Sequence, residues 1–198
     1  MFLKYAAAVV IGYLLGSIST AIIGSKLLFR KDIRTQGSGN AGATNSTRVY
    51  GVMFGIMTLA GDFLKGLAAC LIGRALGGVP ALALAGAACL LGHCFPVYFS
   101  FKGGKGISTG AAIALMIDWR VLALALGLFI VIVAITRIVS PASVAAAVAV
   151  GVGSLLFSRE PWLWALGIFT TVLVVFMHRA NIGRLIRGEE KQFRQERR

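Results

Sequence analysis

Long apolar runs alternate with short polar, glycine-rich stretches along this chain of 198 residues. A helix needs about 20 apolar residues to cross the hydrocarbon core of a bilayer. On this basis the pattern predicts about seven transmembrane helices, some of them short, at 5–24, 53–73, 81–99, 107–117, 121–136, 142–157 and 162–177. The run 107–117 is too short to cross the core alone, so we predict a short span or a half-length helix there. The pattern therefore indicates an all-α integral membrane protein, with residues 1–198 forming a single transmembrane domain.

The first polar stretch, residues 32–48, is the most distinctive part of the chain. Its glycines, Gly37, Gly39 and Gly42, permit φ > 0 turns, and successive N–H groups in such turns form anion-binding concavities. The stretch also carries neutral and cationic donors, namely Ser38, Asn40, Thr44, Asn45, Arg34 and Arg48. This combination favours a phosphate-binding loop over the alternative of a flexible connector.

The second polar stretch, Phe101–Gly106, precedes the apolar run at 107–117. Its residues Lys102, Gly103, Gly104, Lys105 and Gly106 come just before a predicted helix N-terminus, where free N–H groups attract anions. The spacing is not that of a Walker A loop. A second anion site is predicted here, and the alternative is a cationic membrane anchor.

Composition supports the membrane class, because 58% of residues are hydrophobic and the mean hydropathy is +0.84. The net charge of +13 is then explained by Lys and Arg retained on the cytoplasmic side, and nucleic-acid binding is not indicated. With the C-terminal tail cytoplasmic and the N-terminus outside, fifteen basic residues lie inside. Four lie outside, Lys4, Arg74, Arg120 and Arg159, and Lys65 falls within a span. A re-entrant 107–117 would move Arg137 to the outer side.

Several polar residues within or beside the apolar runs are further candidates. Asp62 and Lys65 lie three residues apart inside a predicted helix. They are predicted either to form an internal ion pair or to contact substrate. Other candidates follow near helix ends: His93, Arg137, Ser140, Ser143, His178 and Asn181. A lone histidine such as His93 is more often a structural residue than a catalytic one. The three cysteines are predicted to be buried thiols, and no residue set has metal-ligand spacing.

Little acid–base machinery is visible in the sequence. An H-x-x-x-x-D pattern is absent, since Tyr98 follows His93 and Gly183 follows His178 at the aspartate position. No G-x-S-x-G elbow is present. Asp32 and Asp62 are the two carboxylates expected near the polar cluster. The site is thus predicted to bind anions well without an obvious catalytic base.

These stretches resemble the bacterial acyl-phosphate:glycerol-3-phosphate acyltransferase (PlsY) family over nearly the whole chain. The similar motifs are Asp32-Ile33-Arg34, Gly37-Ser38-Gly39-Asn40, Gly42-Ala43-Thr44-Asn45, Arg48, Asp62, Lys65-Gly66, Gly92-His93, Phe95-Pro96 and Phe101–Gly106. Arg137, Ser140 and Ser143, and His178, Asn181 and Arg184, are similar to its later signatures. Ser19 and Ala41 stand where the family often has proline.

The resemblance implies an inner-membrane enzyme that moves a fatty acyl group from acyl-phosphate to the 1-hydroxyl of glycerol 3-phosphate. No cofactor, no metal and no obligatory protein partner are expected. The expected partners are the two substrates and the lipid bilayer. Ser38, Arg48 and Lys105 are then predicted to be catalytic. The predicted substrate-binding residues are Gly37, Gly39, Asn40, Gly42, Thr44, Asn45, Lys65, His93, Lys102, Gly103, Gly104, Gly106, Arg137, Ser140, Ser143, His178 and Asn181. A phosphate transporter with a cytoplasmic basic vestibule is the main alternative, and a structural membrane subunit is a third.

Overall fold

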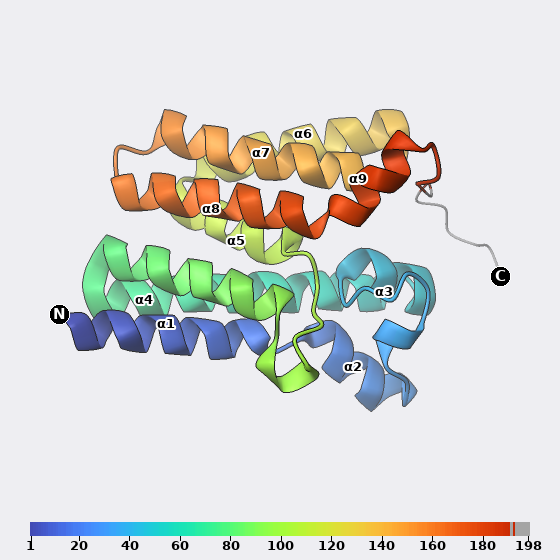
Figure 1. Ribbon diagram of the computed structural model, residues 1–198, viewed down its shortest axis with the longest axis horizontal. Helices are drawn as coiled ribbons and strands as arrows, with labels where there is room; N and C mark the ends of the chain where they lie inside the picture. Colours follow the sequence, from blue (N-terminus) through green and yellow to red (C-terminus); the bar gives the residue numbers. More distant parts are fainter. Residues whose placement is uncertain (191, 193–198) are drawn as a thin grey trace. The chain divides into compact units, whose positions relative to one another are not determined.

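The computed structural model describes residues 1–190 and 192, and every regular element in this part of the chain is helical (Figure 1). The chain forms two compact units, Met1–Thr109 and Gly110–Arg198. The predicted all-α class is therefore confirmed for the described residues. Four basic residues that entered the topology count, Lys191, Arg194, Arg197 and Arg198, lie outside them.

The first apolar run of unit 1 forms two helices instead of the single span predicted at 5–24. Helix α1 covers Phe2–Ser17 and α2 covers Thr20–Phe29. Ile18 between them is extended, and the Ser19 side chain caps α2 by accepting a hydrogen bond from Ile22 N. A serine at this position favours a helix start, which explains why the apolar run is divided.

Helix α4, Val52–Cys94, is broken at Gly77 and Gly78, where the backbone leaves helical geometry. The two arms fold back on each other (Figure 1), so that Gly73 packs against Ala81 and the Cys89 thiol lies 3.7 Å from Lys65 O. The predicted pair of helices joined near 74–80 is confirmed. The second arm ends at Cys94, earlier than the predicted 99.

Glycines let α1 approach the second arm of α4 closely. A methyl group on Gly12 would overlap the backbone of Ala85, and one on Gly16 would overlap the backbone of Cys89. On α4, Gly92 meets the backbone of Tyr13 in the same way. Small residues at such spacing are how helices pack in a bilayer, where no hydrophobic force drives them together.

We expect Gly16→Ala to lower the temperature of unfolding in detergent, because overpacking a tight helix contact costs about 1–3 kcal/mol. Gly127→Ala is the matched control, since a methyl group on Gly127 in Trp119–Thr136 would meet nothing within 4 Å. That control should be unchanged or slightly more stable, because alanine favours helix. Equal stability of the two variants would contradict the close contact.

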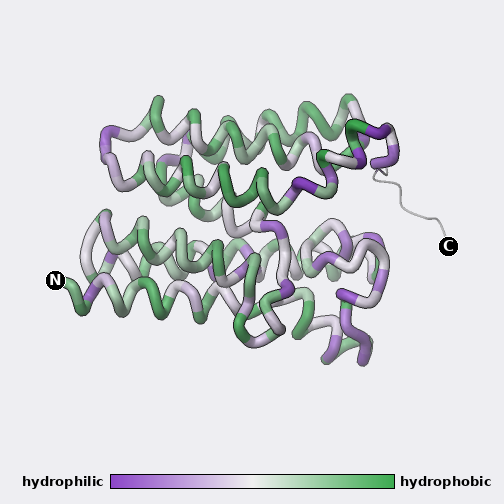
Figure 2. Tube along the Cα trace, in the orientation of Figure 1, coloured by the Kyte–Doolittle hydropathy of each residue, from purple (hydrophilic) through white to green (hydrophobic). Residues whose placement is uncertain are grey.

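The polar connections of unit 1 are more ordered than loops. The stretch predicted as one loop at 32–48 contains a 3-10 turn, η1 (Ile33–Thr35), and the start of helix α3 (Ala43–Tyr50). After α4, the turn η2 (Val97–Phe99) leads through the second polar stretch into α5 (Ile107–Ile117), as predicted. Hydrophilic residues concentrate between α2 and α3, and α1 is mostly hydrophobic (Figure 2).

Unit 2 continues α5 and adds α6 (Trp119–Thr136), α7 (Val139–Phe157), α8 (Pro161–Met177) and α9 (Arg179–Ile186). Helix α7 packs against α6 and α8, and Thr171 Oγ1 donates a hydrogen bond to Ala147 O at 2.6 Å. Pro161 opens α8 as predicted. The bend of 57° between α8 and α9 at His178 ends the apolar part of the unit.

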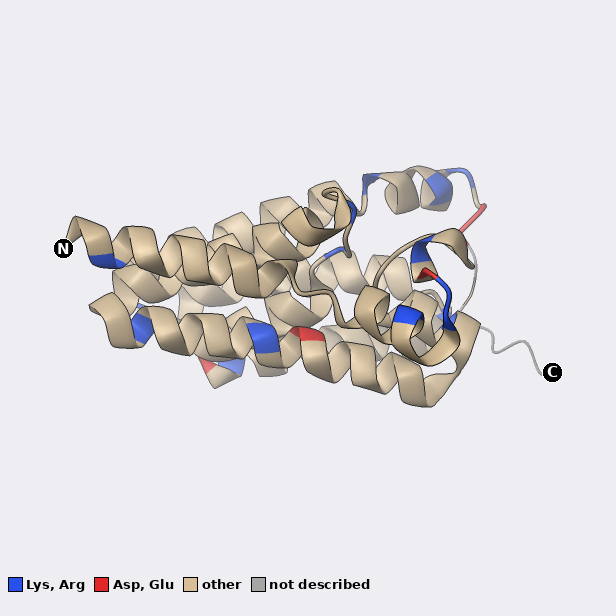
Figure 3. Cartoon of the chain, turned by 90° about the horizontal axis from the view of Figure 1, so that it is seen from below, with Lys and Arg blue, Asp and Glu red and all other residues tan. Residues whose placement is uncertain are grey.

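Four helical segments of the described chain are long and apolar enough to cross a membrane, or five if the bent pair α8–α9 is one span. One of these segments contains both arms of α4. Charged residues are sparse along the helices and more frequent in the connections (Figure 3). The functional candidates are therefore found mainly at helix ends.

Candidate active site

Asn45 holds the first polar stretch together. Its side chain is 2% exposed, its Oδ1 accepts from Ser38 N at 2.9 Å, and its Nδ2 donates to Gln36 O and Asn40 O at 3.0 Å. The amide predicted as a substrate donor is thus occupied by the loop itself. Asn45 fixes the shape of residues 36–40, and we expect any effect on a ligand to be indirect.

The backbone conformation of this turn requires glycine at two of the three predicted positions. Gly37 and Gly39 have φ of +58° and +71°, in the left-handed region. A side chain on Gly37 would also meet the Asn45 side chain. Gly42 differs from the prediction, because its φ is −131° and it serves as the N-cap of α3.

The start of α3 is the strongest anion-binding geometry in this stretch. Its first hydrogen bond runs from Ser46 N to Gly42 O, so the amides of Ala43–Asn45 have no acceptor within the helix. No side chain caps this end, and Thr44 lies in its first turn. Free amides at a helix N-terminus attract anions. Thr44, Asn45 and Arg48 therefore lie on a helix and not in a loop, which corrects the sequence prediction.

Ser38 and Arg48 are both solvent-exposed. Within the described residues, neither the Ser38 hydroxyl nor the Arg48 guanidinium is engaged in a hydrogen bond or ion pair. An exposed hydroxyl and an exposed cation beside free helix amides can bind a phosphate together. Both side chains are thus available as donors, and their predicted catalytic roles stay a prediction.

Arg34, predicted as a cationic donor of the phosphate-binding loop, is engaged within the protein. Asp32 pairs with it in a fork, with Nε–Oδ1 at 3.0 Å and Nη2–Oδ2 at 2.8 Å, and this pairing holds the pKa of Asp32 well below its usual range. Nη1 of Arg34 donates to Phe99 O at 2.7 Å. Arg34 is thus neutralised locally and joins the first polar stretch to the second.

Much of the second polar stretch is occupied by backbone hydrogen bonds. Gly103 N donates to Cys94 O at 3.2 Å and Gly104 N donates to His93 O at 3.1 Å, which satisfies carbonyls at the end of α4. The predicted phosphate-binding amides of these two glycines are therefore engaged. Lys102, before the two glycines, is exposed, and Lys105, after them, is partly buried. Gly106 has φ of +85° and immediately precedes α5.

Asp62 and Lys65 form the internal ion pair that was one of the two predicted alternatives. Their side chains are 3% and 7% exposed, with Nζ and Oδ1 3.0 Å apart. His93 Nδ1 lies 3.6 Å from the same carboxylate oxygen. The three side chains form one buried cluster between the arms of α4.

The remaining predicted site residues lie in unit 2, at the ends of its helices. Ser140 and Ser143 lie buried in the first turns of α7, and His178 and Asn181 are buried at the bend between α8 and α9. His178 Nδ1 lies 2.8 Å from Val174 O. Arg137 ends α6 in a left-handed conformation with φ of +57° and is exposed.

Glu190 is a functional candidate that the sequence prediction missed. Its carboxylate accepts from Asn181 Nδ2 and from Arg184 Nε, both at 2.6 Å. Burial raises the pKa of Glu190, but hydrogen bonds from Asn181 and Arg184 outweigh it and leave the pKa lowered. Asp32 and Asp62 are therefore not the only carboxylates among the candidate residues.

We expect Glu190→Gln to lower the unfolding temperature at pH 7, because hydrogen bonds to a charged group contribute about 1.5–3 kcal/mol. The folded pKa is lowered, so this stabilisation is present above the unfolded pKa of about 4.3 and is lost as the pH falls through the folded pKa. Thermal unfolding at pH 7 and at acidic pH measures the difference. Glu189→Gln, an exposed neighbour, is the matched control, and an equal effect of both changes would contradict the assignment.

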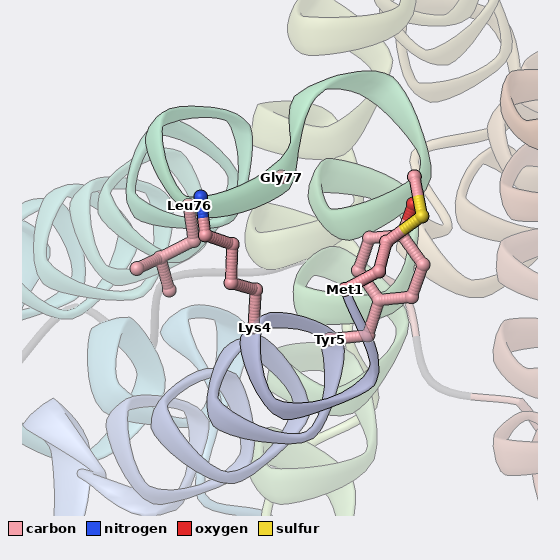
Figure 4. A pocket seen from close by; sticks show the side chains of 5 residues that line it. All are labelled: Met1, Lys4, Tyr5, Leu76 and Gly77. Atoms are coloured by element: carbon pink, nitrogen blue, oxygen red, sulfur yellow. The ribbon is translucent and has the colours of Figure 1, made fainter.

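A pocket of about 370 Å³ lies elsewhere in unit 1, lined by Met1, Lys4, Tyr5, Leu76 and Gly77 (Figure 4). It lies where α1 begins and where α4 turns back, whereas the first polar stretch lies between α2 and the start of α4 and the second follows the end of α4. This pocket is therefore separate from the candidate site. Among residues 1–190 and 192, no group of three or more His, Cys, Asp or Glu side chains could hold a metal ion.

The fold and these polar groups define a class: a helical membrane protein that carries cationic side chains and uncapped amides at helix ends. The sequence model of the family described as glycerol-3-phosphate acyltransferase matches residues 6–188. The chain belongs to this family, which confirms the resemblance drawn from the motifs.

Relatives and solved structures agree with this assignment. A glycerol-3-phosphate acyltransferase of Thioalkalivibrio sulfidiphilus is 46% identical over 187 residues, which cover 93% of this chain and 92% of the relative. One of Desulforudis audaxviator is 43% identical over 192 residues, covering 95% and 96%. A crystal structure of PlsY (YgiH), an integral membrane glycerol 3-phosphate acyltransferase in its glycerol 3-phosphate form, matches with a TM-score of 0.91. It is 34% identical and covers 96% of both chains. Its lysophosphatidic acid form gives a TM-score of 0.88 at 33% identity, covering 95% of this chain and 94% of that one.

Proposed function

We propose that the chain transfers a fatty acyl group from acyl-phosphate to the 1-hydroxyl of glycerol 3-phosphate. The products are 1-acyl-glycerol 3-phosphate (lysophosphatidic acid) and phosphate, as in the first step of phospholipid synthesis. Family membership supports acyl transfer to glycerol 3-phosphate, as do the glycerol 3-phosphate and lysophosphatidic acid forms of the PlsY structures. One observation supports acyl-phosphate as the donor: the chain offers groups for a second phosphate. These are the uncapped amides at the start of α3 and the exposed Ser38 and Arg48.

In this proposal, unit 1 binds phosphate and stabilises the charge that develops during transfer. Ser38, Arg48 and the amides at the start of α3 contact one phosphate. Lys105 and the start of α5 supply positive potential to the reacting groups, with Lys102 beside them. Preorganised donors of this kind cost no reorganisation at the moment of reaction, which is why they lower the barrier.

In the same proposal, unit 2 supplies contacts for glycerol 3-phosphate. His178 and Asn181 bind the acceptor, and Arg137, Ser140 and Ser143 complete the polar set. Glu190 positions Asn181 and Arg184 through its hydrogen bonds of 2.6 Å. A carboxylate that holds an amide and a guanidinium in place can orient both toward an anionic substrate without contacting it.

Purified protein tests the reaction directly. We expect phosphate release from palmitoyl-phosphate to require glycerol 3-phosphate and to be matched by lysophosphatidic acid formation. Transport of phosphate by reconstituted vesicles, without product formation, would instead support the anion-transporter alternative. Palmitoyl-coenzyme A serves as the control donor, and its use at an equal rate would contradict the proposed donor class.

We further propose that the protein lies in the bacterial inner membrane, with its N-terminus outside and the active site facing the cytoplasm. The bias of fifteen basic residues against four on the two sides supports this orientation. It also places both polar stretches of unit 1 and the α8–α9 bend on the cytoplasmic side. The seven-helix prediction requires α5 to cross, which 11 residues do only where the bilayer thins or the helix lies within protein.

Single cysteines in a cysteine-free background test the orientation. We expect Thr35→Cys and Lys102→Cys to be protected from an impermeant thiol reagent in intact cells, and Arg159→Cys to be labelled. All three positions are exposed, which is preferable to Gly104, where a side chain would overlap His93. Outside labelling at Thr35 or Lys102 would reverse the topology.

A further inference from the structure

Asp62, Lys65 and His93 form a buried cluster, and Lys65 also contacts the break between α1 and α2. Lys65 Nζ donates to Ile18 O at 2.7 Å, in addition to pairing with Asp62 at 3.0 Å. Ile18 is the residue at which α1 ends, and carbonyls at a helix end lack partners within the helix. The ammonium therefore satisfies a carbonyl that the break between α1 and α2 leaves open.

Helix α4 holds the chain on both sides of Lys105, through the end of its second arm at His93 and through its first arm at Asp62 and Leu59. Before Lys105, Gly104 N donates to His93 O, and a side chain on Gly104 would overlap His93 Nε2. After Lys105, Thr109 Oγ1 donates to Asp62 O at 3.1 Å and Ser108 Oγ donates to Leu59 O at 2.6 Å. The Asp62 carboxylate thus lies against His93, whose carbonyl holds Gly104 before Lys105, and the Asp62 carbonyl accepts from Thr109 after Lys105.

We infer that Asp62, Lys65 and His93 are positioning residues that set the place of Lys105, and that Lys65 does not bind substrate. Two of the acceptors of its ammonium lie within the protein, and its side chain is 7% exposed. The cluster connects the α1–α2 break, through Lys65, Asp62 and His93, to Gly104. The inference rests on the role proposed for Lys105 in the transfer reaction.

A double-mutant experiment tests whether Lys65 acts through Lys105. We expect Lys65→Met to lower kcat about 10²-fold, the effect of a misplacement of about 1 Å. The KM for glycerol 3-phosphate should change by no more than about threefold, because no substrate contact is lost. Lys65→Arg should recover much of kcat. In the Lys105→Ala background, Lys65→Met should cause no further loss.

The controls separate positioning from folding. Arg74→Met removes an exposed cation from the same arm of α4 and should leave kcat unchanged. If Lys65→Met does not fold, Asp62→Asn with Lys65→Met removes both charges, since neutral replacement of a buried pair is often tolerated. A loss that multiplies with Lys105→Ala, or a large rise in KM at unchanged kcat, would overturn the inference.

A spectroscopic readout distinguishes this inference from the proposed function. A nitroxide on Lys105→Cys, with Cys70, Cys89 and Cys94 replaced by alanine, reports local motion without any reaction. We expect its spectrum to become more mobile in Lys65→Met and to stay unchanged in Arg74→Met. An unchanged spectrum in Lys65→Met would overturn the positioning role. An inactive wild-type protein with a responsive spectrum would reject the acyl-transfer proposal alone.

Discussion

Arg48→Ala and Lys105→Ala should each lower kcat by about 10²–10³ while the protein stays folded, because one interaction with developing charge is worth about 3–4 kcal/mol. Arg48 is exposed on α3, one turn from the free amides of its N-terminus. Lys105 lies between the hydrogen-bonded Gly104 and the start of α5. Both cations therefore occupy positions that a bound phosphate would share with helix amides.

Two further variants sharpen this prediction. Lys31→Ala removes an exposed cation between α2 and η1 and should leave kcat unchanged, which controls for a general effect of surface potential. Arg48→Lys keeps the charge but loses the planar donor fork, so an intermediate rate would indicate that geometry matters. Steady-state kinetics with palmitoyl-phosphate and glycerol 3-phosphate measure all four. Near-normal turnover of both Arg48→Ala and Lys105→Ala would mean that these two cations serve only as membrane anchors.

Helix α3 illustrates what the sequence pattern could not predict. Its residues Ala43–Tyr50 are mostly polar, so no apolar periodicity marks the helix, and Gly42 is predicted from the sequence to be a loop residue. Gly42 and Gly51 are in fact its two caps. Bracketing glycines of this kind are a weak signal, because they are equally typical of turns. Helices α5 to α8, in contrast, begin and end within three residues of their predicted bounds, because long apolar runs mark them. The division of the first apolar run at Ile18 and Ser19 was not predicted, because it depends on a local cap.

The donors in the site show a second limit. Sequence identifies Asn45, Gly103 and Gly104 as groups able to bind phosphate, but it does not reveal that the fold already occupies them. A backbone amide or side-chain amide is available to a ligand only where tertiary contacts leave it unpaired. Ser38 and Arg48 remained available because both are exposed and, among the described residues, their side chains make no hydrogen bond or ion pair.

Glu190 was missed because its partners are brought to it by a chain reversal. Gly188 has φ of +70° and follows α9, so the chain turns back and the carboxylate returns to Asn181 and Arg184. A glycine just after a helix is a recognised end signal, and it was the available clue. Polar contacts across such a turn depend on backbone conformation that residue types alone do not fix.

Ser38→Ala should lower kcat by about 10²–10³, the effect of losing one donor to developing charge. We hypothesise direct transfer: the glycerol hydroxyl attacks the acyl carbonyl, the bond from that carbon to the phosphate oxygen breaks, and the departing phosphate takes the proton. The second ionisation of a phosphate monoester lies near pKa ~6, so the donor itself can accept a proton near neutral pH. Alignment of both substrates can supply about 7–11 kcal/mol of the barrier.

An acyl-enzyme on Ser38 predicts a different outcome. Removing a serine nucleophile costs about 10⁶ in kcat in a well-studied protease, far beyond the effect of one hydrogen bond. It also predicts ping-pong kinetics and an adduct when acceptor is withheld. We expect mass spectrometry of the denatured protein, after incubation with labelled palmitoyl-phosphate alone, to find no stoichiometric adduct. An adduct that glycerol 3-phosphate converts to product would refute direct transfer. If no adduct forms and Ser38→Ala lowers kcat by about 10²–10³, Ser38 acts as a hydrogen-bond donor. A hydroxyl that carries no acyl group can act only through its hydrogen bond.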